Sequence, residues 1–151
     1  MSFPDRRNPY SFEAFLDILH GFDFYADDPF LQRTLKHFAG PEFAELDGKM
    51  RAFSDKVSFR WRPLTDTGGQ PRKLPYVEHF DAYNRRIDRV VRAAETVQLE
   101  KEIFGQGLFS AKVTPWESLA KRYLLHQLGE FGVMCPIACT EGLVALIRHF
   151  P

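Results

Sequence analysis

The sequence has very little cysteine, no net charge and no long apolar run, and each shortage excludes a class of protein. Only two of its 151 residues are cysteines, too few for a disulfide framework, which predicts a reducing, cytoplasmic location. Basic and acidic side chains number 20 each, so a general attraction to nucleic acid or to an anionic membrane is disfavoured. No run approaches the roughly 18 apolar residues of a membrane helix, and residues 1–10 lack the apolar stretch of a signal peptide.

Signatures of catalysis and metal binding are also missing. The sequence has no G-x-S-x-G nucleophile motif, no P-loop and no G-x-G-x-x-G fingerprint. No two histidines stand in the His-x-x-x-His spacing of a helical zinc site. Cys135 and Cys139 are one helical turn apart, and we expect them to be buried structural residues. The residues therefore predict neither a metal site nor a catalytic group.

Apolar and aromatic residues are plentiful, and they indicate one folded domain. Hydrophobic residues make up 44% of the chain, with 15 Phe, five Tyr and two Trp. A domain of this length buries roughly 70% of its unfolded surface, so residues 1–151 are long enough for one core. The same length is too short for a complete cofactor enzyme of two or three domains.

Helix signals dominate the chain. Asp28-Pro29 and Thr114-Pro115 are helix starts in which a capping side chain precedes a proline, and Glu117 completes a capping box with Thr114. Apolar residues at steps of three and four predict a helix from Phe43 to Val57. The predicted fold class is all-α, an antiparallel bundle of about five to six helices.

Two predictions concern the middle of the chain. From Ser58 to Tyr76 the helical period fails, and Pro63 with Gly68-Gly69 predicts one long irregular loop. The longest helix is expected to follow, from near Glu78 or Asp81 to Phe104. His79 and Asp81 could then not form an acid–base pair, because alternate helix positions point apart.

Four arginines on that predicted helix are the best nucleic-acid candidate in the sequence: Arg85, Arg86, Arg89 and Arg92. Guanidinium groups on one helix could follow phosphates, but Asp81, Asp88 and Glu95 would neutralise much of the charge. We expect a solvated or interdomain face, with nucleic acid an unlikely partner. The alternative is a free-standing helical interaction module that binds a protein or nucleic acid through these arginines or through Phe59–Arg62.

After a break at Gly129–Gly132, a last helix is predicted from near Pro136. Its apolar stripe is Cys139, Leu143, Leu146, Ile147 and Phe150. The same helix is rich in small and apolar residues that permit close backbone approach. It is either a buried core helix or the wall of an apolar ligand site, and sequence alone leaves both interpretations open.

Two stretches together resemble a known family. GVMCPIACTEGLVALIRH, from Gly132 to His149, resembles the helix near the end of the N-terminal domain of acyl-CoA dehydrogenases, in particular the AidB-like branch, where Cys-Pro and a following Thr open this helix. FDAYNRRIDRVVRAAETVQLEKEIFGQGL is similar to that branch's segment with a basic pair before Asp-Arg. In place of the histidine-containing stretch that often follows there, this chain has Ala93–Thr96. The resemblance extends over most of the chain.

The resemblance implies a larger flavoprotein of which residues 1–151 are the N-terminal helical domain, with the middle β-domain and the C-terminal helical domain absent. Such a parent uses FAD, oxidises an acyl-CoA, and is expected to be a homo-oligomer. The family's acyl-pocket wall maps onto Leu143, Val144 and Ile147, with Thr140 near the pocket. No catalytic or metal-binding residue carries over. This chain alone, which contacts the remaining domains in the parent, is expected to bind no FAD tightly and to catalyse nothing.

Overall fold

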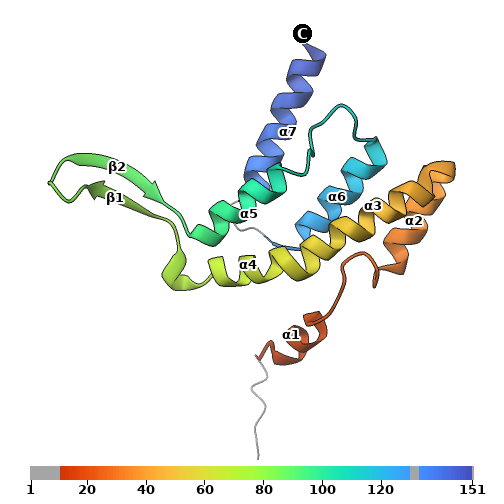
Figure 1. The fold of residues 1–151 in the computed structure, drawn as a ribbon, viewed down its shortest axis with the longest axis horizontal. Helices are drawn as coiled ribbons and strands as arrows, with labels where there is room; N and C mark the ends of the chain where they lie inside the picture. The colour runs from red at the N-terminus through yellow and green to blue at the C-terminus, as the bar shows by residue number, and fades with distance from the viewer. Residues whose placement is uncertain (1–10, 130–132, 151) are drawn as a thin grey trace, which may run out of the picture.

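A computed structural model describes residues 11–129 and 133–150. Within them the chain forms seven α-helices and one two-stranded hairpin (Figure 1). The helices are α1 (Glu13–Leu19), α2 (Pro29–Ala39), α3 (Phe43–Asp55), α4 (Arg62–Gly68), α5 (Ala94–Phe104), α6 (Pro115–His126) and α7 (Met134–His149). The strands are β1 (Tyr76–Phe80) and β2 (Arg86–Val91). The predicted helical class is confirmed. Residues 130–132, within the predicted break, lie outside the described residues, as do residues 1–10 and Pro151.

The two proline-containing helix starts form as predicted. The Asp28 carboxylate accepts the amide of Leu31 at 2.8 Å, and the Thr114 hydroxyl accepts the amide of Glu117 at 3.2 Å. In both helices the proline occupies the first turn, where its missing N–H costs no intrahelical bond. The Glu117 side chain does not complete the expected capping box; it pairs with two lysines instead.

The core lies where α2, α3, α5 and α6 meet. Its largest fully buried side chains are Trp61, Tyr25, Met50, Leu99, Ile103, Leu124 and Leu125. The loop before α2 is held to α3 by polar contacts: the amides of Phe24 and Tyr25 donate to the hydroxyls of Ser58 and Ser54, each at 2.9 Å. These bonds satisfy two buried serines within a helix and fix the entry of the chain into the bundle.

The predicted irregular loop from Ser58 to Tyr76 is wrong for most of its length. Helix α3 continues through a π-helical segment, Lys56–Trp61, directly into α4, and only a 3₁₀ turn and short links precede β1. A π-turn has more residues per turn than an α-helix, so the three-and-four spacing of apolar residues is lost although the backbone stays helical. Pro63 is tolerated because it lies in the first turn of α4.

The long helix predicted from Glu78 or Asp81 to Phe104 is also wrong in its first half. β1 and β2 pair antiparallel with Tyr76 opposite Val91 and Glu78 opposite Arg89, and α5 begins only at Ala94. The turn is stabilised by Asp81, whose carboxylate accepts the amides of Tyr83 and Arg85 at 2.9 and 3.0 Å. The local excess of β-branched and aromatic residues favours strands, and this preference prevails over the apparent helical spacing.

Over the described residues, no helix is long and apolar enough to cross a membrane. The bundle leaves both the β1–β2 hairpin and the C-terminal half of α7 projecting from the body (Figure 1).

Stability at low pH is expected to depend on Glu102 of α5. The Arg60 guanidinium donates to this carboxylate at 2.6 Å and the Trp61 indole donates at 2.9 Å. The hydrogen bonds, led by Arg60 and opposed by partial burial, lower the pKa of Glu102 from its ordinary 4.5 to about 2. The unfolded chain therefore binds this proton at higher pH, so the stabilisation is present above the ordinary pKa and is lost as pH falls towards about 2.

Glu102→Gln is accordingly expected to flatten the fall in unfolding free energy between about pH 5 and pH 2, measured by urea denaturation at several pH values. Glu42→Gln, which changes an exposed carboxylate, is the control and should keep the wild-type slope. Identical slopes for Glu102→Gln and the unaltered chain would contradict the prediction.

Candidate functional site

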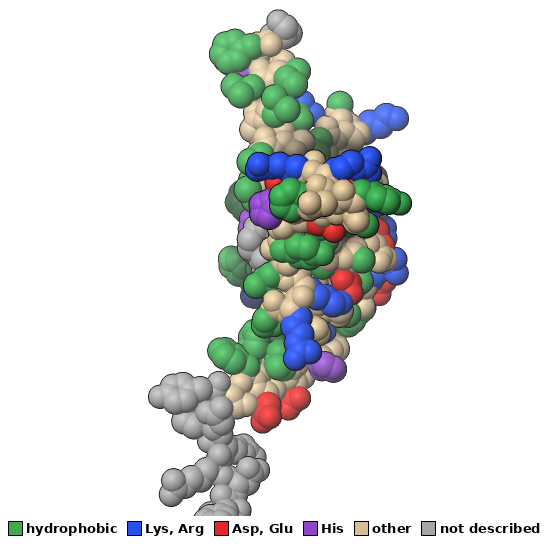
Figure 2. All heavy atoms as spheres, turned by 90° about the vertical axis from the view of Figure 1, so that its left-hand side faces the viewer, with side chains coloured by type: hydrophobic (Ala, Val, Ile, Leu, Met, Phe, Trp, Pro, Cys, Tyr) green, Lys and Arg blue, Asp and Glu red, His purple; other side chains and the backbone are tan. Residues whose placement is uncertain are grey.

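Helix α7 carries the candidate site, and only its first part belongs to the core. Val133, Met134 and Ile137 are buried. The apolar stripe that the sequence leaves open between core and ligand wall is exposed: Leu143 is 56% exposed, Ile147 60% and Phe150 71%. Figure 2 shows the resulting hydrophobic side chains along the projecting end of the molecule, at the top of the view.

Cys135 and Cys139 are exposed as well, so the expectation that they are buried is wrong. The physical reason is the same for all of these positions: α7 faces the rest of the molecule along one side only, through Met134, Ile137, Glu141 and Val144, and the exposed residues lie on its other side. No described element covers the opposite apolar face.

A groove of about 430 Å³ lies between α6 and α7. From α7 it is lined by Glu141, Val144, Ala145 and Arg148. These positions follow the i, i+3, i+4, i+7 spacing of one helix face, a signal that the sequence itself contains. The α6 side includes Ser118, Leu119 and Arg122.

Ion pairing and hydrogen bonding cross this groove. Arg122 forms an ion pair with Glu141 and donates to the Ser118 hydroxyl at 2.9 Å. The Arg148 guanidinium donates to the carbonyl of Phe109 at 3.2 Å. These contacts attach α7 to α6 and to the loop before it, and they give the groove a polar floor beside its apolar wall.

The structure separates the four residues that the resemblance implies. Leu143 and Ile147, one turn apart, share the exposed apolar face, whereas Val144 lines the groove. The Thr140 hydroxyl donates to the carbonyl of Pro136 at 2.7 Å, within the helix. Its hydroxyl is therefore already engaged by the backbone.

The groove does not fit a dinucleotide such as FAD. Its volume of about 430 Å³ is at the low end of the roughly 300–1,000 Å³ range typical of small-ligand pockets, and the Arg122–Glu141 pair crosses it. No cluster of three or more metal-binding side chains that could hold an ion occurs within residues 11–129 and 133–150.

The four candidate arginines do not form a stripe on a helix, which corrects the sequence interpretation. They lie on the β1–β2 hairpin or beside it, and each pairs with a carboxylate: Arg85 with Asp81, Arg86 with Asp88, Arg89 with Glu78 and Arg92 with Glu100. His79 also contacts Asp88, with Nδ1 2.8 Å from the carboxylate. Phosphates would have to displace carboxylates at every position, so the hairpin is a poor phosphate-binding surface.

Comparison with known proteins gives two matches, one by sequence and one by structure. No family model matches the chain. Acyl-CoA dehydrogenase family member 11 of Caenorhabditis elegans is 28% identical over an alignment of 131 residues, and the match covers 80% of this chain and 20% of that protein. The crystal structure of Caenorhabditis elegans ACDH-11 in complex with C11-CoA superposes with a TM-score of 0.73 and 25% identity, covering 83% of this chain and 22% of that one. The chain is similar, over most of its length, to part of an acyl-CoA dehydrogenase family protein.

The predicted resemblance is thus confirmed at the level of the domain. The acyl-CoA dehydrogenase-like domain spans only about a fifth of the length of these relatives.

Proposed function

We propose that this acyl-CoA dehydrogenase-like domain supplies one wall of the acyl-substrate site, together with interdomain surface, in a larger FAD-dependent oxidoreductase. The observation that carries the proposal is the exposed apolar face of α7. Leu143 and Ile147 are each more than half exposed although they are large and apolar. Contiguous apolar surface of this kind marks a binding site or an interface, and apolar side chains are what an acyl chain requires of its pocket.

The relative in the structural comparison was crystallised with C11-CoA, which supports an acyl-CoA as the ligand class. We assign the acyl-contacting role to Leu143 and Ile147 and the groove-side wall to Val144. We assign Thr140 a position near the pocket, where its hydroxyl donates to the Pro136 carbonyl and so leaves no unpaired donor beside an apolar chain. FAD supplies hydride acceptance in the parent, and its site is formed by other domains, because the groove beside α7 does not fit it.

The proposal is tested in a chimera in which this chain replaces the matched segment of the Caenorhabditis elegans relative. Leu143→Trp and Ile147→Trp fill the proposed acyl path. They are expected to lower kcat/KM for C11-CoA about tenfold, the scale of a filled apolar subsite, measured as bleaching of bound flavin. Butyryl-CoA, whose chain is shorter, should be affected much less.

Leu74→Trp provides the control, because Leu74 is 62% exposed but lies far from α7 in the sequence. It is expected to leave kcat/KM unchanged for both substrates. Equal losses with C11-CoA and butyryl-CoA, or an equal loss in the Leu74 variant, would contradict a role for α7 in holding the acyl chain.

A further inference from the structure

Helix α1 presents an apolar face that the described elements cover only in part, at Leu19. None of its residues is buried. Phe12, just before the helix, is 72% exposed, and within it Phe15 is 56% and Leu16 52% exposed. With Leu19 these residues have the i, i+3, i+4, i+7 spacing by which amphipathic helices anchor in an apolar groove.

The same molecule has an apolar groove without an occupant, between α2 and α6. It is a hollow of about 190 Å³, the scale of one large side chain, and Phe30, Phe38, Trp116 and Leu119 contribute to its walls. The rings of Phe38 and Trp116 stack with centroids 5.3 Å apart. Phe30 is nevertheless 70% exposed and Leu119 55%, so the groove is preformed and open.

Charge makes the two surfaces complementary. Glu13 and Asp17 lie one turn apart on α1, and Arg33 and His37 lie one turn apart on α2, with Lys36 beside them. Within the described part of the chain, neither carboxylate of α1 forms an ion pair. The acidic side chains of α1 and the lysine and arginine of α2, the helix that forms one side of the groove, attract each other and disfavour like-charged partners.

Within one copy, α1 is held away from that groove. Arg62 of α4 donates to the carbonyl of Leu19, and Leu16 and Leu19 border a hollow against α4. The following loop is fixed to α3 through Asp23, whose carboxylate accepts the Ser54 hydroxyl at 2.6 Å. The end of α1 is thus attached to α4, and the loop that follows it is attached to α3. A helix that occupies the α2–α6 groove therefore has to come from another molecule.

We propose that α1 of one copy of this chain docks into the α2–α6 groove of a second copy. Phe15 and Leu16 are the apolar anchors, and Glu13 and Asp17 face Arg33 and His37 of the second copy. This contact differs from the acyl wall on α7, so the two proposals stand or fall separately.

Sedimentation of the full 151-residue chain over a range of concentrations tests the contact. The unaltered chain is expected to self-associate, and Leu16→Glu to weaken association at least about tenfold, since 1.4 kcal/mol corresponds to a factor of ten. Leu74→Glu is the matched control, because Leu74 is 62% exposed and lies on neither surface, and it should associate like the unaltered chain. All these positions are exposed, and far-UV circular dichroism confirms that each variant is folded.

A charge exchange gives the sharper test. Glu13→Lys with Asp17→Lys makes α1 basic, and Arg33→Glu with His37→Glu makes the groove edge acidic. Each double variant alone brings like charges together and is expected to be monomeric at low salt. An equal mixture restores both contacts and should sediment with twice the monomer mass, an effect that high salt weakens.

Three results would overturn the proposal. They are a chain that stays monomeric at the highest concentration, a mixture of double variants that stays monomeric, and loss of association in Leu143→Glu but not in Leu16→Glu. The last would place the self-contact on α7.

Discussion

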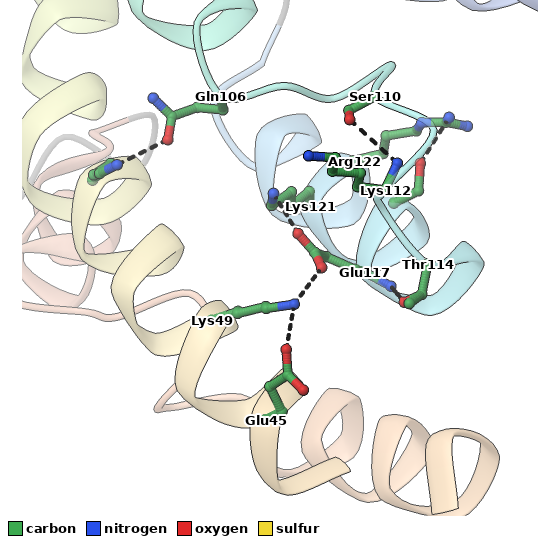
Figure 3. Close-up of polar contacts among 11 residues, drawn as sticks. Glu45, Lys49, Gln106, Ser110, Lys112, Thr114, Glu117, Lys121 and Arg122 are labelled. Carbon is green, nitrogen blue, oxygen red and sulfur yellow. Dashed lines mark hydrogen bonds and ion pairs between the residues drawn. The ribbon is translucent and has the colours of Figure 1, made fainter. Parts of the chain in front are cut away.

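Glu117→Gln is expected to lower the free energy of unfolding by about 3 kcal/mol, the usual cost of removing one member of a buried ion pair. The Glu117 side chain is only 8% exposed and accepts from Lys121 at 2.7 Å and from Lys49 at 3.1 Å (Figure 3). Burial alone would raise the pKa of Glu117, but the bonds from the two lysines outweigh it and hold the pKa below its ordinary value. The carboxylate is therefore charged in the folded chain at neutral pH.

The large effect comes from the cation left behind. The Lys121 side chain is 11% exposed and its ammonium lies 5.6 Å from the ring centre of Phe53. Without Glu117 this ammonium would be buried without a counter-charge, which costs more than the pair itself contributes.

Glu45→Gln is the matched control, because Glu45 also pairs with Lys49, at 2.8 Å, but is 77% exposed. An exposed pair one helical turn apart contributes little to stability, because solvent screens it. Urea denaturation of both variants measures the difference. Similar losses for Glu45→Gln and Glu117→Gln would show that burial does not govern the strength of this cluster.

Local features of this fold could be predicted from sequence, and contacts distant along the chain could not. Asp28-Pro29 and Thr114-Pro115 act through side chains three residues or fewer from the amides they cap, so the sequence contains the whole interaction. Glu117 shows the limit. The capping-box pattern predicts that its carboxylate accepts from the nearby backbone. In the folded chain the carboxylate accepts instead from Lys49, which lies 68 residues earlier.

The hairpin was predicted wrongly, and the surroundings of α7 could not be predicted, for two different reasons. Residues 76–91 contain apolar spacings compatible with helix and strand alike, and only the turn chemistry of Asp81 and the β-branched residues decides between them. In α7 the helix and its apolar stripe were predicted, but a pattern cannot say what covers a stripe. The sequence pattern of Leu143 and Ile147 is the same whether these residues face a core, a ligand or another domain.

Trp61→Ala is expected to destabilise the chain by about 4 kcal/mol, the range for an aromatic residue deleted from a core. Trp61 is fully buried, with its ring edge against Phe53 at a centroid distance of 5.4 Å. Its indole N–H donates to Glu102 at 2.9 Å, and Trp61→Phe, which keeps most of the apolar contact, is expected to cost about 1 kcal/mol for that bond.

Phe59→Ala distinguishes the helical backbone seen at Lys56–Trp61 from the irregular loop that the sequence predicts there. Phe59 lies in the same π-helical segment, two residues before Trp61, but is 45% exposed. Because the segment is helical, only one of the two aromatic residues points into the core, and Phe59→Ala is expected to cost less than about 1 kcal/mol. A loop would leave both residues partly exposed, and both variants would then lose little stability in urea denaturation. A loss of stability in the Trp61 variant alone would therefore support the continuation of α3 through the π-turn into α4. This continuation positions Arg60 and Trp61 to donate to Glu102.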